Sequence, residues 1–186
     1  ADVGLPLAGR AMMAQAINLN ADLGESFGAW RMGSDAELLP IIATASIACG
    51  FHAGDPLVMR RTLRQALAAG VSIGAHPSYP DLQGFGRRVM RLPADELEAL
   101  LIYQIGALAG MAQAEGARLT HVKPHGALSN MACEEAAIAA SVVAAIRCFD
   151  PQLILLAPAL SQLALAGAAA GLRVASEIFS PRRMCG

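Results

Sequence analysis

The stretch DPLVMRRTLRQALAAGVSIGAHP, residues 55–77, decides the fold, because it contains the signals for one complete helix followed by one strand. Asp55 and Pro56 are typical of a helix N-cap and a first helical position, and Gly70 is typical of a helix end. The apolar residues 71–75 then predict a buried strand. The segment therefore predicts a helix–strand unit with His76 at the carboxyl end of the strand.

The same alternation continues on both sides of this unit. In residues 17–23, polar and apolar residues alternate with the period of a strand. Strands are expected at Ile17–Leu23, Ala45–Gly50, Val71–Ala75, Leu119–Pro124, Leu153–Ala157 and Leu172–Ile178. Helices are expected at Asp35–Ala43, Asp55–Ala69, Ala94–Glu115, Glu134–Arg147 and Ala159–Ala170.

Six strands separated by helices predict an α/β fold with a parallel sheet and right-handed crossovers. A complete barrel of eight such units usually needs about 250 residues, and this chain has 186. We therefore expect residues 16–186 to form a single α/β barrel-like domain that is incomplete at its C-terminal end, preceded by an extension at 1–15. A doubly wound sheet is the alternative, because strand order cannot be derived from these patterns.

Composition narrows the function classes. The net charge of -1 provides no basic surface for nucleic acid. No apolar run approaches the roughly 20 residues of a membrane span. Four scattered cysteines without a CxxC pair indicate free thiols and a cytoplasmic protein. Neither a GxGxxG fingerprint nor a GxxxxGK[ST] phosphate loop is present.

All four histidines lie at or just after the C-terminal half of a predicted strand: His52, His76, His121 and His125. Active sites of parallel α/β folds form at the carboxyl ends of the strands, so this clustering predicts a site there. Lys123, the sole lysine, lies between two of these histidines at alternate strand positions, which places all three side chains on one face. A buried lysine needs a partner, and it could bind an anionic group or act as an acid or base.

Asp22 ends the first strand, with Asn18 and Asn20 on the same face. Such a polar row requires hydrogen-bonding partners or a ligand, or it forms a hydrated polar layer. Asp22, His52 and His76 together could also bind a divalent metal ion.

Three further residues are candidates for the functional site, although each could also be an ordinary surface residue. Arg87 and Arg88, in the long Gly- and Pro-rich loop at 74–88, could grip a carboxylate or phosphate, or form an ordinary solvated pair. Glu177 could face inward from the last strand, or lie exposed near the end of the chain.

Five sequence blocks, at 18–28, 48–56, 76–88, 103–108 and 121–130, resemble the LamB/YcsF family over about residues 16–179. The resemblance implies a seven- or eight-stranded barrel-like fold related to glycoside hydrolases and deacetylases. It implies ATP-dependent hydrolysis of 5-oxo-L-proline (pyroglutamate) to L-glutamate, together with partner subunits B and C. The catalytic residues expected are Asp22, His52, His76, Lys123 and His125. The substrate-binding residues expected are Asn20, Glu25, Arg87, Arg88, His121 and Glu177.

The sequence departs from the family pattern in two places. Ser129 stands where the family has tyrosine, and residues 180–186 do not match the family's continuation. A barrel without its last units would expose the edge of the strand at 172–179. Two other functions stay open. One is a metal-dependent deacetylase or amidohydrolase that needs no ATP, and the other is a non-catalytic truncated remnant that binds partner subunits.

Overall fold

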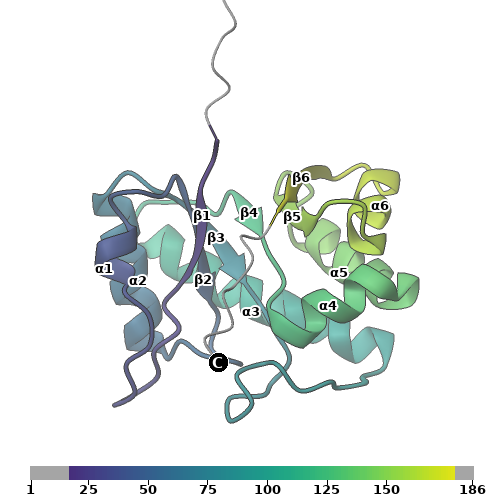
Figure 1. Ribbon diagram of the computed structural model, residues 1–186, viewed down its shortest axis with the longest axis horizontal. Coiled ribbons are helices and arrows are strands. Elements are labelled where there is room, and N and C mark those ends of the chain that lie inside the picture. Colours follow the sequence, from purple (N-terminus) through teal and green to yellow (C-terminus); the bar gives the residue numbers. More distant parts are fainter. Residues whose placement is uncertain (1–16, 179–186) are drawn as a thin grey trace, which may run out of the picture.

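The computed structural model describes residues 17–178, which form one six-stranded parallel sheet (Figure 1). The strands are β1 (Asn20–Leu23), β2 (Thr44–Ala48), β3 (Ser72–His76), β4 (His121–Val122), β5 (Ile154–Pro158) and β6 (Arg173–Glu177). Each strand pairs with the next one in the chain, so the order is β1-β2-β3-β4-β5-β6. A doubly wound sheet reverses its strand order at a switch point, so that alternative is wrong.

The sheet is strongly curled. Lys123 Nζ, directly after β4, lies 2.9 Å from Asp22 Oδ1 on β1 and 3.4 Å from Glu177 Oε2 on β6. Neighbouring strands are about 4.8 Å apart, so six strands in a flat sheet would separate β1 and β6 by about 24 Å. One ammonium group could not reach both. The fold is therefore α/β and barrel-like, as expected, and the seven or eight strands of the family fold stay a prediction.

The helices are α1 (Asp35–Leu38), α2 (Pro56–Ala68), α3 (Ala94–Ala114), α4 (Gly126–Glu134), α5 (Ala136–Phe149) and α6 (Gln162–Ala169). In Figure 1, α1 and α2 lie beside β1 and β2, while α4, α5 and α6 gather on the opposite side of the domain. The predicted cap of α2 is confirmed, because Asp55 accepts from the backbone N–H groups of Leu57 and Val58. No sequence signal predicted α4, whose N-cap residue His125 makes no side-chain capping bond.

The core lies between the sheet and the helices, and α3 shows how it is built. Its buried apolar residues recur every three or four positions: Leu97, Leu101, Ile105, Leu108 and Ala112. This stripe faces α5 and β3. Among the described residues, α3 is also the one helix long and apolar enough to cross a membrane, a test that core helices of soluble proteins pass as well.

Both outer strands of the described sheet are paired on one side only. On β6, Ala175 and Ser176 are exposed, and the following Ile178 is 92% exposed. Within the described residues, β6 therefore has the expected unpaired edge, while Leu172 before it is buried. The expected extension at 1–15, and Phe179 of the predicted edge, lie outside the described residues.

Candidate active site

The loop after β1 is fixed by acids from the two helices that follow it. Asp35 Oδ2 accepts from the N–H of Gly24 at 2.9 Å, and Asp55 Oδ2 accepts from the N–H of Gly28 at 2.7 Å. Asp55 therefore caps α2 and holds the loop at the same time. Glu25 lies in this loop with its side chain 18% exposed, directed at the histidines.

Three imidazoles pack together at the carboxyl ends of the strands, and we call His52, His76 and His125 the histidine cluster. The rings of His52 and His125 stack at 3.9 Å, while the His76 ring is edge-on to both. The Phe85 ring closes the cluster edge-on, 5.1 Å from the His125 ring. Asp22 Oδ2 lies 3.4 Å from His76 Nε2, so the predicted convergence of these histidines beside Asp22 is confirmed.

Backbone carbonyls fix the orientation of two of the rings. His76 Nδ1 lies 2.6 Å from the carbonyl oxygen of Lys123, and His125 Nε2 lies 2.8 Å from that of Phe85. A carbonyl oxygen only accepts hydrogen bonds, so both ring nitrogens donate. Glu25 Oε1 lies 3.2 Å from His52 Nε2, 3.5 Å from His125 Nδ1 and 3.9 Å from His76 Nε2.

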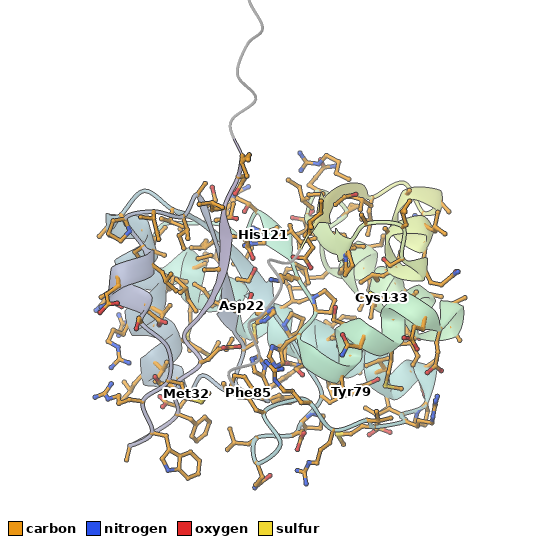
Figure 2. The ribbon with its side chains drawn as sticks, viewed as in Figure 1. Asp22, Met32, Tyr79, Phe85, His121 and Cys133 are labelled. Carbon is orange, nitrogen blue, oxygen red and sulfur yellow. The ribbon has the colours of Figure 1, made fainter. Side chains whose placement is uncertain are left out.

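A second polar layer lies deeper inside the curled sheet. Lys123 Nζ donates to Asp22 Oδ1 and, at 3.2 Å, to Asn20 Oδ1. His121 lies next to Ser46 and Thr120, and Figure 2 shows it in the interior above Asp22. The polar row on β1 therefore has the partners that its burial requires. Gly74 on β3 makes room for this layer, because a side chain there would overlap the His121 ring.

The pKa shifts of the ionisable groups in the site favour the charged form of some groups and the neutral form of others. Although burial opposes ionisation, His76 and Lys123 hold the pKa of Asp22 well below its usual range. Burial likewise opposes a charge on His76, but the carboxylate of Asp22 raises the pKa of that imidazole. Burial lowers the pKa of His52 to about 2 and that of His125 to about 3. The surroundings thus favour the charged forms of Asp22 and His76 and the neutral forms of His52 and His125.

The two remaining acids behave differently from Asp22. Burial raises the pKa of Glu25, against the attraction of His76 and His125. Burial also raises the pKa of Glu177, against the attraction of Lys123. Glu177 Oε1 is buried without a hydrogen-bond partner among the described residues. Of the two orientations that the sequence left open for Glu177, the structure shows the inward one.

A groove of about 820 Å³ approaches Lys123 from the amino ends of the strands. Its lining includes Asn20, His121, Lys123 and Glu177, and none of the histidine cluster. Residues of all six strands line it, from Asn20 on β1 to Glu177 on β6. The histidine cluster therefore occupies the opposite end of the sheet, where the chemistry of a parallel α/β fold is expected.

The two loop arginines have different surroundings. Arg88 binds the buried carboxylate of Asp81, with Nε 2.7 Å from Oδ1, and does not reach the histidine cluster. Arg87 is exposed, with its guanidinium 5.5 Å from the centre of the Phe85 ring, and its charge acts on Glu25. Gly86 directly precedes Arg87 in the loop and lies against the histidine cluster, where an added Cβ would come 2.9 Å from both His125 Cδ2 and His52 Cβ.

Sequence reasoning missed Gln104, a positioning residue on α3. Its side chain is fully buried, accepts from the N–H of Ser78 at 3.0 Å and donates to the carbonyl of Ser78 at 2.8 Å. It therefore fixes the segment that follows His76. A glutamine within the apolar stripe of a predicted helix was the signal that could have revealed it.

Comparison with known proteins gives a consistent picture. The sequence profile of the LamB/YcsF family matches residues 17–185, so the predicted end of the similarity at 179 is wrong. A curated protein of Azoarcus sp. (strain BH72), named as the A subunit of 5-oxoprolinase, is 72% identical over 166 residues, which is 89% of this chain and 65% of that protein. A protein of the same name from Methylococcus capsulatus is 61% identical over 92% of this chain and 66% of its own length.

Among solved structures, the lactam utilization protein of Thermus thermophilus superposes with a TM-score of 0.87 at 44% identity. The match covers 90% of this chain and 72% of that protein. The chain thus spans about two thirds of the curated relatives.

Proposed function

Because the chain belongs to the LamB/YcsF family, we propose that it acts in the ATP-dependent hydrolysis of 5-oxo-L-proline to L-glutamate. We propose that it does so as one subunit of a complex with B and C subunits, in the cytoplasm. The names of its relatives support this reaction. The observation that carries the proposal is the convergence of Asp22 and Glu25 with the histidine cluster at the carboxyl ends of the strands.

The chemistry of the substrate explains why such a site is needed. The ring amide of 5-oxoproline is resonance-stabilised, so water does not open it readily. Phosphorylation of the carbonyl oxygen by ATP makes that carbon more electrophilic. A general base must then take a proton from the attacking water. As the ring C–N bond breaks, the nitrogen takes up the proton that the base removed, and γ-glutamyl phosphate forms. A second water then releases phosphate and leaves glutamate.

Asp22 is the base that we propose among the candidates Asp22, His52 and His76. Its carboxylate is ionised and 28% exposed, so a water molecule can reach it. His52 has no exposed surface. His76 is already paired with the carboxylate of Asp22, which raises the pKa of its imidazole against the effect of burial.

Arg87 is the cation that we propose for the carboxylate of the substrate. It is exposed at the edge of the histidine cluster, whereas Asp81 binds Arg88. Lys123 contacts two carboxylates, so it would have to leave one of them to hold a substrate anion. Asn20, His121 and Glu177 surround Lys123 from the groove side. For these three residues we propose an indirect part in binding, through the position of Lys123.

ATP and a divalent metal ion complete the proposal. The sequence contains no phosphate loop, so we place ATP binding on one of the partners or at a surface shared with it. The thiols of Cys49, Cys133 and Cys148 are unpaired, which supports a reducing compartment.

The test is glutamate release from 5-oxoproline by the purified chain, with and without ATP and with and without the two partner subunits. The relative from Azoarcus serves as positive control. We expect release only when ATP and both partners are present, and Asp22→Asn should lower turnover by about 10²-fold or more. If the relative releases glutamate with the partners and this chain only binds them, the chain is a non-catalytic remnant.

One observation favours a second function, a metal-dependent deacetylase or amidohydrolase. Glu25 and the histidine cluster offer ligand atoms within 4.8 Å of one another, a set that suits a divalent ion. Such an enzyme would cleave amides with metal alone. Turnover that requires a metal ion and not ATP would favour it over the first proposal.

A further inference from the structure

Two nitrogen atoms of the histidine cluster face each other at close range. His76 Nε2 and His125 Nδ1 are 3.1 Å apart. In each ring, the other nitrogen donates its hydrogen to a backbone carbonyl. A neutral imidazole carries only one hydrogen, so in the neutral form both facing nitrogens present lone pairs. A positive charge between them is required, either a proton or a metal ion.

The third donor favours a metal ion. Glu25 Oε1 lies 3.5 Å from His125 Nδ1 and 3.9 Å from His76 Nε2. Ligands 2.0–2.1 Å from a tetrahedral zinc ion are separated by about 3.3–3.4 Å. The three separations of 3.1, 3.5 and 3.9 Å enclose that value. A single proton lies between two atoms and would leave the carboxylate of Glu25 outside the bond.

Ring orientation decides which histidines take part. The rings of His52 and His125 are stacked with an angle of only 6° between their planes. A metal ion lies near the plane of each imidazole that binds it, so it cannot lie in both of these planes. The planes of His76 and His125 meet at 85° and can share one ion. His52 therefore packs beside the site. Lys123 holds Oδ1 of Asp22, and Oδ2 of Asp22 lies 3.4 Å from His76 Nε2, so this carboxylate borders the proposed site.

We propose that His76 Nε2, His125 Nδ1 and Glu25 Oε1 bind one divalent ion of the zinc type, with a fourth position open for water or a ligand. Two histidines and one glutamate form a known ligand set of catalytic zinc. An ion there would polarise a carbonyl oxygen or acidify a bound water. The proposal deepens the proposed function and rests on it for the role of the ion, but binding itself is measurable without substrate.

The surroundings of the three ligands fit this assignment. Both histidines are at most 4% exposed, and each donates its second N–H to a carbonyl, which is the usual support of a metal-binding imidazole. Glu25 is the exposed member, with 18% of its side chain open. The open coordination position would therefore face the solvent side, where Arg87 also lies.

The experiment is a zinc titration of the full chain after dialysis against a chelator. Isothermal calorimetry gives affinity and stoichiometry, and cobalt in place of zinc reports tetrahedral coordination through its visible absorption. We expect one ion per chain. Glu25→Gln, His76→Gln and His125→Gln should each weaken binding by about 100-fold or more.

His121→Gln is the matched control, because it removes the one buried histidine that lies outside the histidine cluster. Its zinc affinity should equal that of the parent. Circular dichroism checks folding, and the partly exposed Glu25→Gln keeps the test valid if a histidine variant does not fold. Absence of zinc binding, or equal affinity in parent and Glu25→Gln, would overturn the proposal. Neither result depends on glutamate release, so the proposed function stands or falls separately.

Discussion

Replacement of Lys123 by methionine should destabilise the fold through the two acids that it leaves behind. The ammonium group lies 2.9 Å from Asp22 and 3.4 Å from Glu177, and the side chains of Lys123, Asp22 and Glu177 are 7%, 28% and 14% exposed. Removing one partner of a buried pair costs about 3–5 kcal/mol. Asp22 is partly exposed, so we expect the lower end, about 3 kcal/mol. For a chain of this length that corresponds to a fall in Tm of roughly 6–12 °C.

Thermal melts followed by circular dichroism measure this effect. The double variant Lys123→Met, Glu177→Gln should recover part of the loss, because it replaces one stranded carboxyl group by a neutral group of the same shape. Arg64→Met is the control, since Arg64 pairs with Glu115 on the surface with 55% exposure, and its Tm should match the parent. If Lys123→Met melts within about 2 °C of the parent, or if the double variant is no more stable than the single one, the reasoning is refuted.

Three other outcomes are expected. Burial lowers the pKa of His121 to about 4 from 6.5, so its contribution to stability is complete above pH 6.5 and about 3 kcal/mol of it is lost as the pH falls towards 4. In urea titrations, the stability of His121→Gln should therefore fall less steeply than that of the parent between pH 6.5 and 4, and parallel curves would contradict this. Gly86→Ala should lower Tm and zinc affinity, because its Cβ would press on the histidine cluster. Gly28 has a similar positive φ and free space around it, so Gly28→Ala is the control, and equal losses in both variants would leave only backbone strain as the cause. Burial raises the pKa of Cys49 to about 12. At pH 8, iodoacetamide should therefore label the exposed Cys148 and leave Cys49 unmodified in peptide mass spectra. Equal labelling of the two thiols would show that the native core opens readily.

The sequence predicted the elements whose signals are local. The cap at Asp55 and the end at Gly70 define α2 without any tertiary information. The helix α4 was missed because it begins at Gly126 without a capping side chain. Tertiary contacts hold it instead: its Ala127 N–H donates to the carbonyl of Gly86, in the loop after β3.

The residues of the site likewise include some that the sequence predicted and some that it could not predict. The histidine cluster was predictable because parallel strands bring their carboxyl ends to one edge. The need of Lys123 for a partner was predictable from the cost of burying a charge. The pairing of Arg88 with Asp81 was not, because it depends on the path of a loop. The stacking of His52 on His125, which decides the proposed ligands, is equally invisible in the sequence.

The bond between Asp22 and Lys123 also has a consequence for the order of folding. The two residues are 101 positions apart in the chain. At a synthesis rate of 5–20 residues per second, about 5–20 s separate their appearance on the ribosome. During this interval β1, β2 and β3 can form, but the acid on β1 faces water without its ammonium partner. The proposed base therefore gains its ammonium partner only after β4 has joined the sheet.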